Sequence, residues 1–352
     1  MSKSSTIKKE DMRGFLKYFE GERKLVGPVD TGKVIEFREA SSNDILMDDR
    51  VSYKSLKEYY FPQTELMFTF KDGEVTDNTD IPGFVIFGAR PCDLEALRVM
   101  SVVYTTGKYA DPFFQRRFEK NLLIGVGCLE QKPECFCRDM EIDKEFSDFC
   151  DIMLFDNGDS YSVGHLSEKG KKALEEYLSA NDKDSSVAEL LQNDTNGIFS
   201  VSSEESSKSR NDSSVKPLSP IKLNTNKEDS VYFDIIDWEK TTETCKGCGI
   251  CTYICPTCYC FDFKDVSKKG EATRYKCWDS CMYPKFTLHA SGHNPRENRY
   301  ERYRQRVLHK YKYVPENFDG YVACTGCGRC VRSCPVGINI KSIVTQVKEA
   351  EE

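Results

Sequence analysis

The sequence predicts an α+β protein with two domains, a mixed α/β domain followed by a smaller helical domain rich in cysteine. Three observations lead to this prediction. The chain has 352 residues, which is more than one hydrophobic core usually organises. Short β-rich runs alternate with helical patterns in its first part, and one four-cysteine spacing occurs twice in its last part. We expect an α/β domain over 1–195, a linker over 196–230 and the second domain over 231–352.

The first domain is predicted from its hydrophobic spacing. Met12, Phe15, Leu16 and Phe19 recur at helical intervals, so a helix is expected over 10–20. Four apolar runs have the length and composition of strands, namely 34–37, 65–70, 83–89 and 122–127.

A helix should follow the third of these strands. Leu94, Leu97, Met100 and Val103 fall on one helical face, and Asp93 stands where an N-cap would be. Residues 171–178 have the pattern of a further surface helix.

The stretch between the two domains changes composition. Residues 196–220 are rich in Ser, Pro and charge and poor in apolar side chains, so they cannot bury enough surface to offset their ordering entropy. We expect a flexible linker here; a regulatory phosphorylation segment is the alternative.

The strongest signal in the chain is a repeated cysteine run. CKGCGICTYICP begins at Cys245 and CTGCGRCVRSCP begins at Cys324, both with the spacing C-x2-C-x2-C-x3-C-P. This spacing is typical of 4Fe–4S ferredoxins, in which the fourth cysteine binds the other cluster, and the neighbouring glycines allow tight turns. The sequence therefore predicts two 4Fe–4S clusters, one bound by Cys245, Cys248, Cys251 and Cys334, and the other by Cys324, Cys327, Cys330 and Cys255. A pair of zinc sites is the alternative, although zinc ribbons use two separated C-x2-C knuckles.

The first domain has cysteines of its own at strand-to-loop exits. Because strand ends on one sheet edge lie close together, these thiols could converge on a third cluster. The residues concerned are Cys92, Cys128, Cys135 and Cys137. The alternative is that they are ordinary buried or surface thiols, since free cysteine is often buried.

Further cysteines lie between the two runs. Cys258, Cys260 and Cys281 are expected to pack or hydrogen-bond around the clusters without binding iron; a further cluster shared with Cys277 is the alternative. We expect no catalytic residue in the chain.

Composition excludes several classes of protein. The net charge of −7 argues against a nucleic-acid-binding protein, and no apolar run is long enough to span a membrane. The N-terminus lacks the apolar core of a signal peptide, and clustered cysteines in a chain of this length favour iron–sulfur ligation over disulfides. We therefore expect a cytoplasmic protein of a reducing, anaerobic metabolism.

One stretch is basic within this acidic chain. Its positive charges could stabilise a reduced cluster or dock an acidic partner such as ferredoxin, and the alternative is a solvated helix face. Its members are Arg296, Arg299, Arg302, Arg304, Arg306, His309 and Lys310.

Several blocks taken together resemble a known family. They are LKEYYFPQTELMFTF, FGARPCDLEAL, CFC, the first cysteine run with its PTCYC extension, WDSCM, ASGHNPR, RYRQRVLHKY and CTGCGRC. In combination these blocks are similar to the β subunits of sulfhydrogenase-type nickel–iron hydrogenases and to the related A subunit of anaerobic sulfite reductase. The resemblance covers nearly the whole chain outside the Ser-rich stretch, and the second domain resembles α-helical ferredoxin domains.

The resemblance implies an iron–sulfur electron-transfer subunit. Such a subunit passes electrons between a flavoprotein subunit that reacts with NAD(P)H and a separate catalytic subunit, which could be a hydrogenase, a sulfite or sulfur reductase, or a heterodisulfide-reductase-like enzyme. The chain has no G-x-G-x-x-G fingerprint after a strand, which fits a relay that needs a flavoprotein partner. Two alternatives stay open at this point: a reductase with its own active-site cluster in the first domain, and a zinc-structured interaction module.

Overall fold

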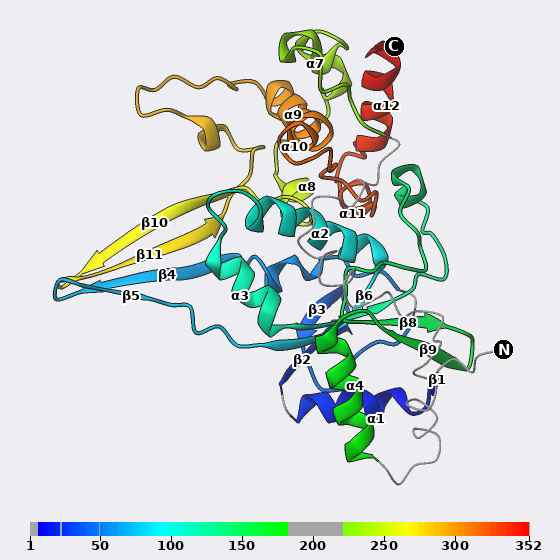
Figure 1. The fold of residues 1–352 in the computed structure, drawn as a ribbon. Coiled ribbons are helices and arrows are strands. Elements are labelled where there is room, and N and C mark those ends of the chain that lie inside the picture. The colour runs from blue at the N-terminus through cyan, green and yellow to red at the C-terminus, as the bar shows by residue number, and fades with distance from the viewer. Residues whose placement is uncertain (1–5, 22, 49, 182–220, 352) are drawn as a thin grey trace. The chain divides into compact units, whose positions relative to one another are not determined.

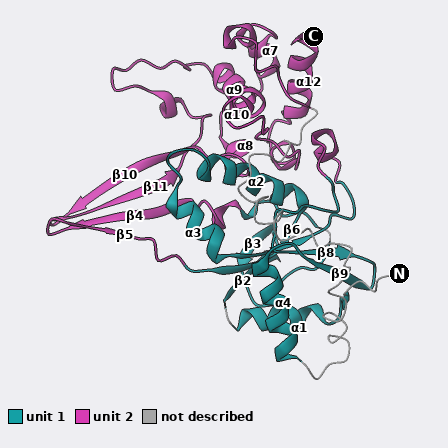
Figure 2. Ribbon diagram, viewed as in Figure 1, with its two compact units in different colours: residues 1–56, 82–131, 143–215 teal, residues 57–81, 132–142, 216–352 magenta. Residues whose placement is uncertain are grey.

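The computed structural model describes residues 6–21, 23–48, 50–181 and 221–351. The chain divides into two compact units that interleave along the sequence (Figure 2). The first unit comprises 1–56, 82–131 and 143–215, and the second comprises 57–81, 132–142 and 216–352. The second unit thus includes two segments from the part of the sequence predicted to be the first domain. Residues 196–220 of the predicted linker lie outside the described residues.

The first unit is built on a seven-stranded mixed sheet with the strand order β1-β9-β8-β7-β6-β2-β3 (Figure 1). Its four central strands are parallel, and the three remaining strands are antiparallel to their neighbours. The strands are β1 (Thr6–Lys8), β2 (Lys24–Asp30), β3 (Ile35–Glu39), β6 (Phe84–Ala89), β7 (Leu122–Val126), β8 (Ile152–Asp156) and β9 (Ser160–His165).

Helices cover both faces of this sheet. On one face α1 (Met12–Glu20) and α4 (Glu168–Ala180) pack with the strands in one hydrophobic core. On the other face lies α2 (Pro91–Thr105), whose Leu94 approaches Gly125 of β7 closely, and α3 (Pro112–Lys120) packs against α2. Because the central strands are covered on both sides, they are apolar at nearly every position instead of alternating.

The mixed α/β prediction is confirmed, with one local correction. The helix of α2 begins at Pro91 with Arg90 as its N-cap, so the prediction that Asp93 is the N-cap was wrong. Proline at the first helical position is pre-organised for the helix and starts it earlier. Asp93 instead lies buried in the first turn of the helix.

The second unit contains a four-stranded antiparallel sheet that sequence analysis predicted only in part. Its order is β10-β11-β4-β5, with β4 (Thr64–Lys71), β5 (Glu74–Asp77), β10 (Phe261–Lys268) and β11 (Glu271–Trp278). Glu65 of β4 lies opposite Lys276 of β11, and their buried side chains form an ion pair of 2.8 Å. This pairing ties the segment 57–81 to the C-terminal part of the chain.

The rest of the second unit is helical. Its helices are α7 (Trp238–Thr241), α8 (Ile250–Tyr253), α9 (Arg299–Leu308), α10 (Val314–Asn317), α11 (Arg329–Arg332) and α12 (Ile340–Glu351). Its short turns are η1 (Leu56–Tyr59), η2 (Cys137–Met140), η3 (Asp229–Phe233), η4 (Pro284–Thr287) and the π-helical η5 (His309–Tyr313). One core joins α9, η5 and α12 to Phe136 and Met140 of the segment 132–142. Among the described residues no helix has the length and apolarity needed to cross a membrane.

Candidate metal centres

The two cysteine runs form matching loop-and-helix units. Each run passes through two glycines with positive φ before a short helix, at Gly247 and Gly249 before α8 and at Gly326 and Gly328 before α11. Glycine adopts this backbone conformation without strain, which lets three cysteines of each run wrap around one space. Helices α8 and α11 pack against each other, so the two copies are neighbours.

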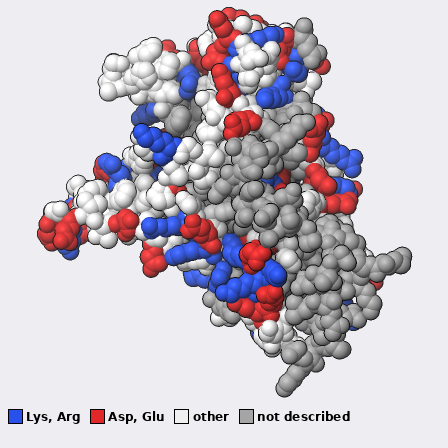
Figure 3. All heavy atoms as spheres, in the orientation of Figure 1, with Lys and Arg blue, Asp and Glu red and all other residues white. Residues whose placement is uncertain are grey.

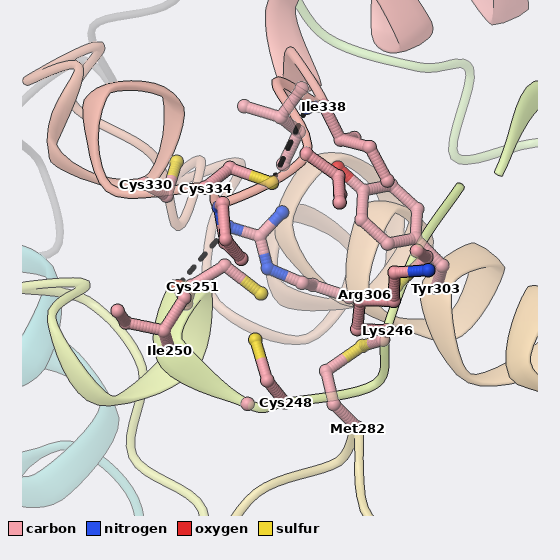
Figure 4. A pocket seen from close by; sticks show the side chains of 15 residues that line it. Lys246, Cys248, Ile250, Cys251, Met282, Tyr303, Arg306, Cys330, Cys334 and Ile338 are labelled. Atoms are coloured by element: carbon pink, nitrogen blue, oxygen red, sulfur yellow. Dashed lines mark hydrogen bonds between the residues drawn. The ribbon is translucent and has the colours of Figure 1, made fainter.

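The first pocket is bordered by cysteines of both runs (Figure 4). Its thiols are those of Cys245, Cys248, Cys251, Cys330 and Cys334. Backbone N–H groups of Gly247 and Ile338 lie 3.4 Å and 3.3 Å from the sulfur atoms of Cys245 and Cys334. N–H groups directed at sulfur are a usual feature of iron–sulfur sites.

The second pocket lies beside the first, since Arg306, Cys330 and Ile340 border both. Its thiols are those of Cys255, Cys324, Cys327 and Cys330. Cys330 therefore borders both pockets. The first pocket also includes Cys334, the fourth cysteine of the second run, and the second pocket includes Cys255, the fourth cysteine of the first run. The structure brings together the two predicted sets of four, and each set contains three cysteines of one run with the fourth of the other.

These pockets fit the chemistry of the predicted clusters. All seventeen cysteines are free thiols. Within the part of the chain that the structure describes, no three or more His, Cys, Asp or Glu side chains converge on a single metal ion. Instead, four or five cysteines line each pocket, which matches the four thiolates that a 4Fe–4S cluster takes.

Burial raises the pKa of thiols in both pockets. It raises the pKa of Cys251 to about 11 and that of Cys327 to about 12. A cysteine binds iron as the thiolate, so cluster binding must release protons here. Buried positive charges beside the thiols favour that release.

Buried cations border the pockets or contact the cysteine loops beside them. Arg306 borders both pockets, and Lys310 borders the second and donates a hydrogen bond of 3.2 Å to the sulfur of Cys255. Lys57, from the early segment 57–81, donates to the carbonyl of Cys258 at 2.9 Å and lies 4.0 Å from the centre of the Trp278 ring. All three are at most 3% exposed.

The predicted basic stretch is thus only partly a surface feature. Arg302, Arg306 and Lys310 recur every four residues and are buried, while Arg299 is exposed. On the face shown in Figure 3, basic side chains lie beside acidic ones among the described residues.

The segment 132–142 lies at the second pocket, which sequence analysis did not foresee. The N–H of Phe136 donates to the carbonyl of Gly326 at 2.7 Å, and the thiol of Cys135 contacts the carbonyl of Cys327 at 3.5 Å. Phe136 itself borders the pocket. The signal that could have found this contact is the apolar pattern of FCRDMEI, because Phe136, Met140 and Ile142 all enter the core of the second unit.

The predicted third set of cysteines is distributed over both units. Cys92 and Cys128 belong to the first unit, and Cys135 and Cys137 belong to the second. A third cluster bound by these four residues therefore stays a prediction.

The cysteines between the runs form contacts of their own. Cys258 interacts with Cys255, and Cys260 interacts with Cys281. Cys277 lies between Lys276 and Trp278 on β11, so its side chain points to the opposite face of the sheet from theirs.

His309 should make the free energy of unfolding depend on pH. Its ring nitrogen Nε2 lies 3.2 Å from the Tyr259 hydroxyl, and burial lowers its pKa to about 4, helped by the charge of Lys310. The unfolded chain therefore binds the extra proton near pH 6.5 and the folded chain does not, so stability falls as the pH drops. We expect a loss of about 1 kcal/mol between about pH 7.5 and about pH 5.5. Urea unfolding of the wild type and of His309→Gln should show this slope only in the wild type; equal slopes would contradict the assignment.

The fold and the pockets define an iron–sulfur protein. Residues 244–338 match the family model of the 4Fe-4S dicluster domain. The chain is 30% identical over 336 residues to sulfhydrogenase 2 subunit beta of Pyrococcus furiosus, covering 93% of this chain and 92% of that protein. The chain belongs to the family of sulfhydrogenase-type β subunits and related iron–sulfur proteins. No solved structure matches it.

Proposed function

We propose that this chain is the iron–sulfur electron-transfer subunit of a hydrogenase-type complex. The observation that carries the proposal is the pair of adjoining pockets, which share Cys330 and Arg306 and are each bordered by cysteines of both runs. The family relationship supports the same function, because the relative in Pyrococcus furiosus is the β subunit of a sulfhydrogenase.

Two 4Fe–4S clusters would be held crosswise between the runs. Cys245, Cys248 and Cys251 with Cys334 would bind the first cluster, and Cys324, Cys327 and Cys330 with Cys255 would bind the second. The helices α8, α11 and α12 would place them in an arrangement like that of α-helical ferredoxin domains. When bound, the clusters supply one-electron carriers. The chain's own contribution is to fix their spacing, to shield them from water and to offset negative charge with buried cations.

We expect two kinds of partner subunit. A relay of this kind needs a flavoprotein that exchanges electrons with NAD(P)H and a catalytic subunit that binds the final acceptor. Ferredoxin is a further candidate partner.

The experiment compares the chain alone with its native complex, both isolated anaerobically. We expect dithionite to reduce the isolated chain and NAD(P)H to leave it oxidised. NAD(P)H should produce the same EPR signals in the complex only while the flavin is present. Reduction of the isolated chain by NAD(P)H, or its turnover of sulfite or sulfur with an artificial donor, would contradict the relay and favour a reductase with its own active site.

A further inference from the structure

The helix α9 and the π-helical turn η5 carry buried cations toward the two pockets. Arg302, Arg306 and Lys310 follow one another at intervals of four residues, which places them along one side of a helix. The exposed fractions of Arg306 and Lys310 are 2% and 3%. Long basic side chains are almost never buried to this extent unless they meet negative charge.

Arg306 is directed at both pockets. In Figure 4 its side chain extends among Cys251, Cys330 and Cys334. One terminal nitrogen donates to the carbonyl of Cys251 at 3.3 Å, while Nε has no hydrogen-bond partner among the described residues. The guanidinium group of Arg306 therefore keeps a hydrogen-bond donor that the described residues do not satisfy, and it lies between the two pockets.

Lys310 is directed at the second pocket alone. Its ammonium group donates to the sulfur of Cys255 at 3.2 Å, to the Thr257 hydroxyl at 3.0 Å and to the Ala323 carbonyl at 2.8 Å. It does not border the first pocket.

Neither cation is neutralised by a carboxylate among the described residues. The neighbouring Lys312 provides the contrast, since it is equally buried but pairs with Asp229 at 2.8 Å and Glu316 at 3.3 Å. The charges of Arg306 and Lys310 are thus left to act on whatever anionic group the pockets hold.

We propose that Arg306 and Lys310 set the reduction potentials of the two cluster sites, Arg306 acting on both and Lys310 selectively on the second. The inference rests on the proposed function, because it assumes that both pockets hold clusters. A buried positive charge stabilises the reduced form, which carries one more electron, and so raises the potential. Arg306 borders both sites, so its charge acts on both potentials.

The test is a redox titration monitored by EPR. The neutral variants are Arg306→Met and Lys310→Met, and each cluster's signal is assigned beforehand in chains that lack one cluster through Cys248→Ser or Cys327→Ser. At a fixed potential, Lys310→Met should lower the reduced-to-oxidised ratio of the second cluster about tenfold, which is about 59 mV for one electron. The first cluster should change much less. Arg306→Met should shift both clusters in the same direction.

Two controls are a variant that retains the positive charge and the removal of a buried lysine that borders neither pocket. Lys310→Arg should restore most of the second cluster's potential, and Lys312→Met should leave both potentials unchanged because Lys312 borders neither pocket. If the methionine variants lose iron, glutamine at the same positions keeps a donor without the charge and gives the potentials instead. Loss of iron from the glutamine variants as well would overturn the inference, because the side chains would then serve the fold.

Different results would contradict the inference about the two cations and the proposed function. Unchanged potentials in variants that hold both clusters would overturn the inference alone. A wild-type chain without iron would overturn the proposed function.

Discussion

Serine in place of Cys334 is expected to abolish the cluster site formed by the other cysteine run. Cys334 ends the second run in sequence, yet it borders the first pocket and not the second. A serine hydroxyl is not deprotonated at neutral pH and is a harder, poorer ligand for iron than a thiolate. Iron should fall from about eight to about four atoms per chain, as for the loss of one 4Fe–4S cluster.

The identity of the lost cluster decides between crosswise and local ligation. The EPR signal that remains in Cys334→Ser should match the one in Cys248→Ser and differ from the one in Cys327→Ser, since Cys248 borders only the first pocket and Cys327 only the second. Cys277→Ser is the matched control, because Cys277 borders neither pocket, and it should keep about eight iron atoms. A residual signal like that of Cys327→Ser would contradict the crosswise arrangement.

Alanine in place of Gly328 is expected to destabilise the second unit strongly. The residue has a φ of +71°, and a Cβ there would meet the carbonyl oxygen of Glu134 at 2.6 Å and the backbone nitrogen of Cys135 at 2.9 Å. Left-handed backbone costs a non-glycine residue roughly 1–2 kcal/mol, and overpacking adds typically 1–3 kcal/mol. The clash is with backbone, so no side chain can rotate to relieve it.

Gly337 supplies a matched control for this substitution. Its φ is also +71°, but a Cβ there would meet nothing within 4 Å. Gly337→Ala should therefore show only the backbone cost of about 1–2 kcal/mol. Anaerobic urea unfolding should place Gly328→Ala about 1–3 kcal/mol below Gly337→Ala in free energy of unfolding. Equal losses would mean that the segment 132–142 does not lie against the second run.

Much of this architecture was predictable because strands and helices are specified by the spacing of apolar residues that are neighbours in sequence. The strands β4, β6 and β7 and the helix α1 follow from apolar spacing within a few residues. The grouping of the eight cysteines follows from the spacing of ferredoxin runs, whose geometry is dictated by the cluster itself.

What the sequence did not reveal depends on contacts between distant segments. Nothing near Glu65 indicates that its strand pairs with β11, and nothing near Phe136 indicates that it borders the second pocket. The hairpin β10–β11 was missed because charged and polar residues interrupt the apolar pattern of both strands; its local mark is the turn at Lys269 and Gly270, both with positive φ. The burial of Arg306 and Lys310 runs against the usual preference of basic residues, and such exceptions are expected where a function requires them.

The measurement that tests the central claim most directly is the content of iron and acid-labile sulfide per chain after anaerobic purification, with EPR of the reduced protein. Two 4Fe–4S clusters predict about eight of each and the signals of two reduced clusters. About twelve would support the third cluster as well, and Cys135→Ser would then test whether that cluster uses the predicted cysteines. A colourless protein containing zinc, or one with about four iron atoms, would contradict the account of two adjoining clusters that relay electrons.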